Sequence, residues 1–134
     1  MKIGVDFDGF ITTNRWYKGK RNLPWQLIFM GVIILEPFIR PKKEVVDALR
    51  RWAKNNDEIS IISARPKELK KLTASRLFKY KVPFHRLVLV GTGKGVEERK
   101  LKAIQELGVE FYLDDDRKTV NFLRKNGVRA HYFK

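Results

Sequence analysis

The chain contains no cysteine among its 134 residues, which excludes disulfides and thiolate metal sites and predicts a cytoplasmic protein. It also lacks a long hydrophobic run. The apolar stretch 25–38 is interrupted by Gln26, Glu36 and Pro37 and is shorter than the roughly 20 residues of a transmembrane helix. No signal peptide is apparent, because the chain opens directly into an apolar strand pattern. The length predicts one domain, residues 1–134, with its own core.

Acidic residues are the scarcer charged class, since 15 Asp and Glu face 29 Lys and Arg for a formal net charge of +14. A chain this basic attracts anions and can bind nucleic acid non-specifically. The charge therefore has three interpretations: it steers an anionic substrate, it is a general bias of a solvated surface, or it serves nucleic-acid binding.

Against this basic background, the most informative segment is acidic: residues 5–10, with the sequence VDFDGF. A short apolar strand ends at Asp6 and Asp8, and residues i and i+2 of an extended chain point the same way. Gly9 then allows a sharp turn. Two carboxylates held this close repel each other unless a cation or a proton joins them, so the pair indicates a metal, a phosphate chemistry, or both.

Two further strand patterns end in polar side chains. One runs into the triplet Asp114-Asp115-Asp116, and the other ends at Ser63, followed by Ala64 and Arg65. For Asp116 we expect a capping role at a helix that starts near residue 117. For Arg65 two interpretations remain open, substrate binding and a structural ion pair.

Strand and helix patterns alternate along the chain, which predicts a three-layer, Rossmann-like α/β fold with a mainly parallel five-stranded sheet. In such sheets ligands bind beyond the carboxyl ends of the strands, so the acidic clusters and Ser63 should share one site. The expected strands are 2–6, 58–63, 86–91, 109–114 and 128–132, and the expected helices are 42–55, 67–79, 96–107 and 117–126.

These elements resemble the haloacid dehalogenase (HAD) superfamily of phosphatases over nearly the whole chain. The segment 6–9 looks like the first family motif, Ser63 like the second, a helical lysine like the third, and the pair Asp114-Asp115 like the fourth. The resemblance implies the strand order 5-4-1-2-3 and a small form with a minimal or absent cap, residues 10–40 being a short insertion in the cap position.

The resemblance also implies roles for individual residues and Mg²⁺ as cofactor. Asp6 would be the nucleophile that forms an aspartyl-phosphate, and Asp8 the general acid and base. The implied metal ligands are Asp6, Asp8 through its backbone carbonyl, Asp114 and Asp115. The phosphoryl group would be bound by Ser63 and a lysine, and further substrate contacts are expected from Gly9, Ala64, Arg65 and Lys94.

The motif lysine has two candidates, Lys94 and Lys100. On a helical wheel Lys100 falls in the middle of an apolar face formed by residues 96, 103, 104 and 107, where an ammonium needs an anion to meet or must extend out to solvent. Lys94 lies in the turn GTGKG, which fails the P-loop pattern. We therefore favour Lys100 as the catalytic lysine.

The insertion 10–40 mixes aromatic and basic residues, which could stack a base and hold phosphates or could simply pack on the domain. Residues 27–35 are apolar on every side and should be buried in the core or against a partner chain, so homo-oligomerisation through residues 24–38 is an option. Phe10 stands where the family has a smaller residue and should narrow the opening of the site.

The sequence thus predicts a Mg²⁺-dependent phosphomonoester hydrolase acting through an aspartyl-phosphate. Nucleotides or a nucleic-acid terminal phosphate suit the basic charge best. The alternative is a non-catalytic, basic nucleic-acid-binding module on a HAD-like scaffold. No membrane association is expected.

Overall fold

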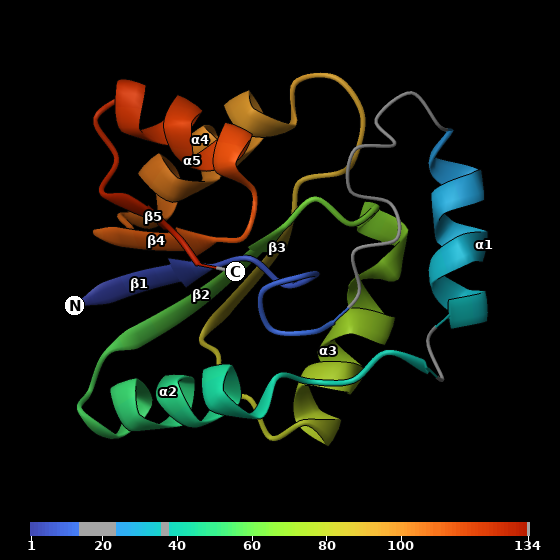
Figure 1. Ribbon diagram of the computed structural model, residues 1–134, viewed down its shortest axis with the longest axis horizontal. Coiled ribbons are helices and arrows are strands. Elements are labelled where there is room, and N and C mark those ends of the chain that lie inside the picture. The colour runs from blue at the N-terminus through green and yellow to red at the C-terminus, as the bar shows by residue number, and fades with distance from the viewer. Residues whose placement is uncertain (14–23, 36–37, 134) are drawn as a thin grey trace.

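Five parallel strands form one sheet in the computed structural model, which describes residues 1–13, 24–35 and 38–133. The order β3-β2-β1-β4-β5 is the expected order 5-4-1-2-3 read from the other edge, and it puts β1 in the centre (Figure 1). The strands are β1 (Lys2–Val5), β2 (Glu58–Ser63), β3 (Arg86–Leu89), β4 (Phe111–Asp114) and β5 (Ala130–Tyr132).

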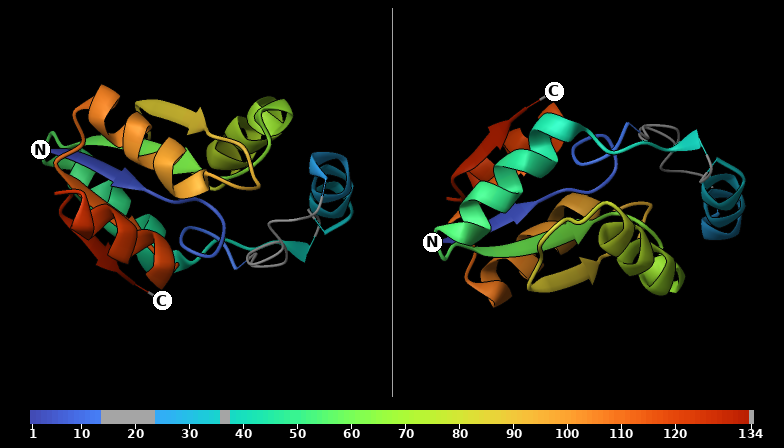
Figure 2. Two further views of the ribbon diagram at one scale, coloured as in Figure 1. Left: turned by 90° about the horizontal axis from the view of Figure 1, so that it is seen from above. Right: turned by 90° about the horizontal axis from the view of Figure 1, so that it is seen from below.

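Helices cover both faces of the sheet, which confirms the three-layer α/β class (Figures 1 and 2). On one face lie α2 (Lys43–Lys54) and α3 (Lys70–Lys79), the latter preceded by the short 3₁₀ helix η2 (Lys67–Leu69). On the other face lie α4 (Val96–Leu107) and α5 (Arg117–Lys125). Among the described residues, no helix combines the length and the apolar composition needed to cross a membrane.

The alternation of side chains along the strands divides the core into two layers. Ile59 and Ile61 of β2 join the layer under α2 and α3, together with Leu49 of α2. Ile62 points the other way and packs with Ile104 of α4. Because β2 is covered on both faces, its residues from Ile59 to Ser63 are all buried, the two serines included.

The start of α5 confirms the predicted cap. Asp116 is the residue before the helix, and its Oδ1 accepts a hydrogen bond of 3.3 Å from the backbone N–H of Lys118. Its Oδ2 accepts a second hydrogen bond, 2.7 Å, from Oγ1 of Thr119. Both oxygens of Asp116 thus cap α5, so Asp116 has a different role from that expected of Asp114 and Asp115.

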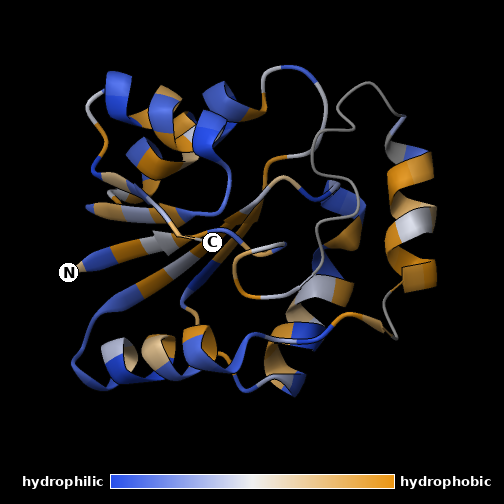
Figure 3. Cartoon of the chain, viewed as in Figure 1, coloured by the Kyte–Doolittle hydropathy of each residue, from blue (hydrophilic) through white to orange (hydrophobic). Residues whose placement is uncertain are grey.

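The apolar run in the insertion forms α1 (Trp25–Leu35), a helix that lies beyond the carboxyl ends of the strands (Figure 1). Ile28 and Val32 are fully buried against Leu69 and Leu89. Figure 3 shows that α1 is hydrophobic over most of its length. Four of its apolar residues are nevertheless exposed, with exposures of 50% for Leu27, 58% for Met30, 46% for Ile33 and 65% for Ile34. The expectation that the core buries this run is wrong for these four residues, and burial against a partner chain stays a prediction.

Phe10 corrects another expectation. Instead of narrowing the site, it is only 3% exposed and packs in the core layer under α2, with its ring edge-to-face against Phe133 at 6.0 Å between centroids. The turn that carries Phe10 is pinned by backbone hydrogen bonds from Ile11 to Phe7, 2.9 Å, and from Lys42 to Ile11, 2.7 Å. This turn therefore holds the end of β1 rigidly.

Candidate active site

Three carboxylates meet at the carboxyl ends of the two central strands. Asp6 follows β1, while Asp114 and Asp115 stand at the end of β4, the neighbour of β1 in the sheet. One carboxylate oxygen from each lies within 4.8 Å of the others, and all three residues are buried. A compact all-oxygen group of this kind is the donor set that Mg²⁺ prefers.

Lys100 reaches the same cluster from α4. Its Nζ donates to Oδ2 of Asp114 at 2.8 Å and to Oδ1 of Asp6 at 3.3 Å, and the residue is 3% exposed. The helical periodicity thus placed Lys100 correctly, whereas Lys94 is exposed on the preceding loop.

Two neighbouring carboxylates keep the Lys100 side chain positively charged. Burial alone would lower the pKa of the Lys100 ammonium, but the carboxylates of Asp114 and Asp6 outweigh this effect and raise the pKa above its ordinary value of 10.5. Because the pKa is raised, the ammonium contributes its full stabilisation below that ordinary value while the two aspartates are ionised, and this contribution is lost as pH rises through the raised pKa. Lys100 is therefore cationic throughout the neutral range.

Asp8 is not part of the carboxylate cluster but is bound by Arg65. Oδ2 of Asp8 accepts from Nε of Arg65 at 2.7 Å and Oδ1 accepts from Nη2 at 2.9 Å, with both side chains fully buried. The remaining Nη1 donates to Oγ1 of Thr73 at 3.1 Å, and the guanidinium lies over the ring of Phe7. This geometry favours the ion-pair interpretation of Arg65 over direct substrate binding.

Ser63 is buried at the end of β2, next to the ion pair. Its Oγ accepts a hydrogen bond of 3.1 Å from the backbone N–H of Arg65, and its carbonyl accepts one of 2.8 Å from Val90. These contacts orient the turn that also carries Ala64. The structure therefore brings Ser63 to the same sheet edge as Asp6, one strand away.

Gly9 makes the close approach of the two central loops possible. Its φ is +80°, and a Cβ built at this position would collide with Oδ2 of Asp115. Its carbonyl accepts a hydrogen bond of 2.6 Å from Nζ of Lys42, which anchors the turn to the start of α2. Only a glycine satisfies both the backbone conformation and the space.

Replacing Gly9 by Ala should therefore lower the free energy of unfolding by about 1–3 kcal/mol through backbone strain, with a further loss from the collision with Asp115. The matched control is Gly127→Ala, because Gly127 has a φ of +84° but a Cβ added there would meet nothing within 4 Å. Urea unfolding of both variants measures the difference. Equal losses in the two variants would show that the contact with Asp115 is unimportant.

Three residues that the sequence did not single out support the site. Tyr112 lies two residues before Asp114 on β4, and its hydroxyl is 3.1 Å from Oδ2 of that aspartate. Arg99 binds the GTGKG turn by donating to the carbonyls of Val90, Gly91, Thr92 and Lys94 at 2.7–3.2 Å. The third is Thr73, the partner of Arg65. Of the three, only Tyr112 could have been found from the sequence. It lies two residues before Asp114, and residues two apart on a strand point to the same face.

Most of the aromatic and basic residues of the insertion fall outside the described part of the chain. These are Arg15, Trp16, Tyr17, Lys18, Lys20 and Arg21. Phe29 of α1 is described, and it packs partly buried against the cluster around Leu69 and Leu89. For Phe29 the packing interpretation is therefore the appropriate one.

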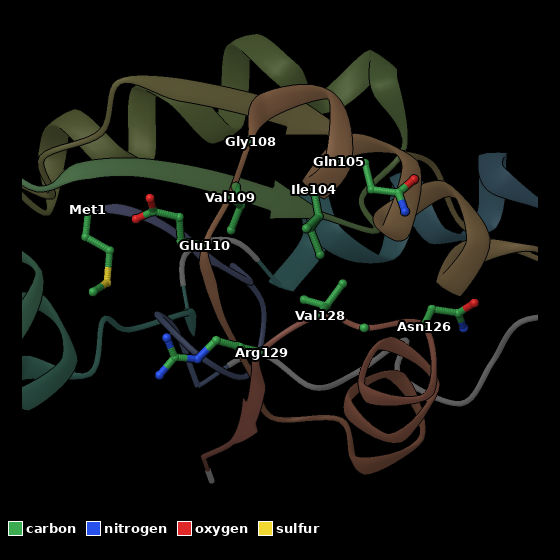
Figure 4. A pocket seen from close by; sticks show the side chains of 10 residues that line it. Met1, Ile104, Gln105, Gly108, Val109, Glu110, Asn126, Val128 and Arg129 are labelled. Carbon is green, nitrogen blue, oxygen red and sulfur yellow. The ribbon is translucent and has the colours of Figure 1, made fainter.

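A groove of about 750 Å³ lies at the opposite edge of the sheet, where the strands begin (Figure 4). Its lining combines the apolar side chains of Met1, Ile104, Val109 and Val128 with the charged side chains of Glu110 and Arg129. Ligands of open parallel sheets bind at the carboxyl ends of the strands. We therefore take the buried polar cluster, and not this groove, as the candidate active site.

No protein-family model matches the chain, and no curated protein matches it either. Solved structures do share its fold. A chain of the Pnkp1/Rnl/Hen1 RNA repair complex superposes with a TM-score of 0.73 at 19% identity, covering 98% of this chain and 42% of that one. A second structure of the Pnkp1/Rnl/Hen1 complex gives a TM-score of 0.74 at 18% identity, with coverages of 98% and 45%.

A HAD-superfamily hydrolase from Ehrlichia chaffeensis also superposes, with a TM-score of 0.58 at 14% identity. Here the match covers 99% of this chain and 87% of the hydrolase. The chain spans less than half the length of the RNA-repair chains that it matches. At such low identities these likenesses show the fold alone, a Rossmann-like α/β fold that a HAD-superfamily hydrolase also adopts.

Proposed function

We propose that the chain is a member of the HAD superfamily and acts as a Mg²⁺-dependent phosphomonoester hydrolase. The observation that carries the proposal is the buried group of Asp6, Asp114 and Asp115 with the Lys100 ammonium bridging two of the carboxylates. Both similar folds support it, one being that of a HAD hydrolase and the other that of a chain in an RNA repair complex.

The proposed metal ligands are the side chains of Asp6, Asp114 and Asp115 and the backbone carbonyl of Asp8. Their compact, oxygen-only arrangement fits Mg²⁺. When bound, Mg²⁺ offsets the repulsion between an anionic nucleophile and an anionic phosphate.

The covalent step would be carried out by Asp6. One of its oxygens forms a bond to phosphorus while the bond from phosphorus to the leaving alkoxide breaks, and the alkoxide takes a proton from Asp8. Asp8 then removes a proton from the water that cleaves the aspartyl-phosphate. Ser63 and Lys100 would bind the phosphoryl oxygens and stabilise their charge.

The ion pair with Arg65 adds a requirement to this scheme. Both oxygens of Asp8 accept hydrogen bonds from the buried guanidinium. Asp8 must therefore give up at least one of these bonds before it can carry a proton to the leaving group. Arg65 thus acts on the general acid and not on the phosphate.

For the substrate we propose a nucleotide or the terminal phosphate of a nucleic acid. The formal net charge of +14 favours a polyanionic substrate, and the fold is shared with a chain of an RNA repair complex. The same charge favours the second candidate, a non-catalytic nucleic-acid-binding module. A small insertion in the cap position, whose described residues include the helix α1, would leave the site open to a large substrate.

The test is phosphate release from p-nitrophenyl phosphate and from 3′- and 5′-phosphorylated oligonucleotides, with Mg²⁺ and with EDTA. We expect release that requires Mg²⁺ and is lost in Asp114→Asn. A binding module would instead release no phosphate, and its affinity for oligonucleotides would fall steeply with salt and survive Asp6→Asn. That second pattern would reject the hydrolase.

A further inference from the structure

Beneath the carboxylate cluster lies a tyrosine that the proposed chemistry does not use. Tyr112 is fully buried in the core layer under α4 and α5, and its hydroxyl is 3.1 Å from Oδ2 of Asp114 and 3.3 Å from the carbonyl oxygen of Ile62. A phenol hydroxyl carries one proton that it can donate.

That proton has a preferred acceptor. The carboxylate oxygen is nearer than the carbonyl oxygen and is charged, and hydrogen bonds to ionised acceptors are about twice as strong as neutral ones. The same Oδ2 accepts from Lys100 at 2.8 Å, and Oδ1 of Asp114 accepts from the backbone N–H of Asp116 at 3.0 Å. The Asp114 carboxylate thus accepts hydrogen bonds from at least three donors: Lys100, the Asp116 N–H and the Tyr112 hydroxyl. The tyrosine lies on the same strand as Asp114.

A glycine on the neighbouring strand leaves the space that the Tyr112 ring occupies. Gly4 of β1 stands directly opposite Tyr112 of β4, and a Cβ built on Gly4 would lie 2.9 Å from Cδ2 of the ring. The same Cβ would lie 3.0 Å from Cγ1 of Val109, so a larger residue at position 4 would force the ring and its neighbour to shift. A buried hydroxyl in an otherwise apolar layer is costly unless it is hydrogen-bonded, so a phenylalanine would be the simpler choice if packing alone mattered.

We infer that Tyr112 is a positioning residue that holds Asp114 in the orientation required to bind the metal ion. This inference rests on the proposed metal site at Asp6, Asp114 and Asp115. Partners that orient a metal-binding carboxylate typically change metal affinity or activity by about 10- to 100-fold when they are removed. The Tyr112 hydroxyl meets that description, since it touches the ligand without being one.

The experiment is calorimetric titration of Mg²⁺ into metal-free wild type, Tyr112→Phe, Asp114→Asn and Tyr80→Phe. Tyr80→Phe is the matched control, because that hydroxyl also donates to a carbonyl, that of Ile39 at 3.3 Å, while its ring follows α3 and packs against the other core layer. We expect the Kd for Mg²⁺ to rise about 10-fold in Tyr112→Phe and to stay at the wild-type value in Tyr80→Phe.

Wild-type affinity in Tyr112→Phe, together with loss of binding in Asp114→Asn, would overturn this inference and leave the proposed metal site intact. Absence of Mg²⁺ binding in the wild type would overturn both. Thermal unfolding in EDTA checks that Tyr112→Phe is folded. If it is not, Gly4→Ala replaces it, because this variant keeps the hydroxyl and displaces the ring, and here too a wild-type Kd would overturn the inference.

Discussion

Replacing Asp6 by Asn should reduce phosphate release by at least about 10³-fold, because the amide cannot form the covalent intermediate on which both steps depend. The substitution keeps the size of the side chain. Lys100 also retains its shorter hydrogen bond, the one to Asp114 at 2.8 Å. The fold should therefore survive, and the steady-state rate with p-nitrophenyl phosphate and saturating Mg²⁺ measures the loss.

The control for this variant is Asp47→Asn, which removes a carboxylate from the exposed side of α2, where Asp47 pairs with Arg50 at 3.6 Å. We expect wild-type rates from it. A rate in Asp6→Asn within about tenfold of the wild type, from a folded protein, would show that Asp6 is not the nucleophile.

Replacing Arg65 by Met should destabilise the protein by about 3–5 kcal/mol, since it leaves the Asp8 carboxylate buried without the guanidinium that binds both its oxygens. Such a loss is a large share of the roughly 5–15 kcal/mol that stabilises a typical domain. Urea unfolding, followed by circular dichroism, measures it at constant pH.

Two further variants sharpen this prediction. Arg50→Met should cost much less, because Arg50 is partly exposed and donates to the carbonyls of Tyr80 and Lys81. The double variant Asp8→Asn/Arg65→Met should recover part of the stability lost in Arg65→Met, because no buried charge is then left alone. A loss below about 1 kcal/mol in Arg65→Met would show that the ion pair does not stabilise the fold.

The fold could be predicted from the sequence because its signals are local and repeated. Apolar strands alternate with amphipathic helices, and this alternation admits few arrangements other than a parallel sheet covered on both faces. The strand ends then bring Asp6 and Asp114 together, since β1 and β4 are neighbours. Lys100 was found for a similar reason, as a cation in the middle of an apolar helix face.

Other features depend on contacts between distant residues and have no local signal. The pairing of Asp8 with Arg65 joins positions 57 residues apart, so the sequence left two roles for Arg65 open. The burial of Phe10 against Phe133 required the C-terminal strand to be in place. The α1 run is apolar on all sides, so its periodicity could not show which side would face Leu69 and which would be left exposed.

The central claim is that phosphate becomes covalently attached to Asp6, and trapping the intermediate tests it most directly. Asp8→Asn should slow the second step while sparing the first when the substrate is p-nitrophenyl phosphate, because the nitrophenolate leaves without needing a proton. Incubation of this variant with p-nitrophenyl phosphate and Mg²⁺ followed by borohydride should therefore reduce the aspartyl-phosphate to homoserine at position 6. Peptide mass spectrometry of the segment 3–15 then reads out the position. We predict homoserine at position 6 only when substrate is present, whereas unmodified Asp6 in a preparation that still releases phosphate would contradict the mechanism.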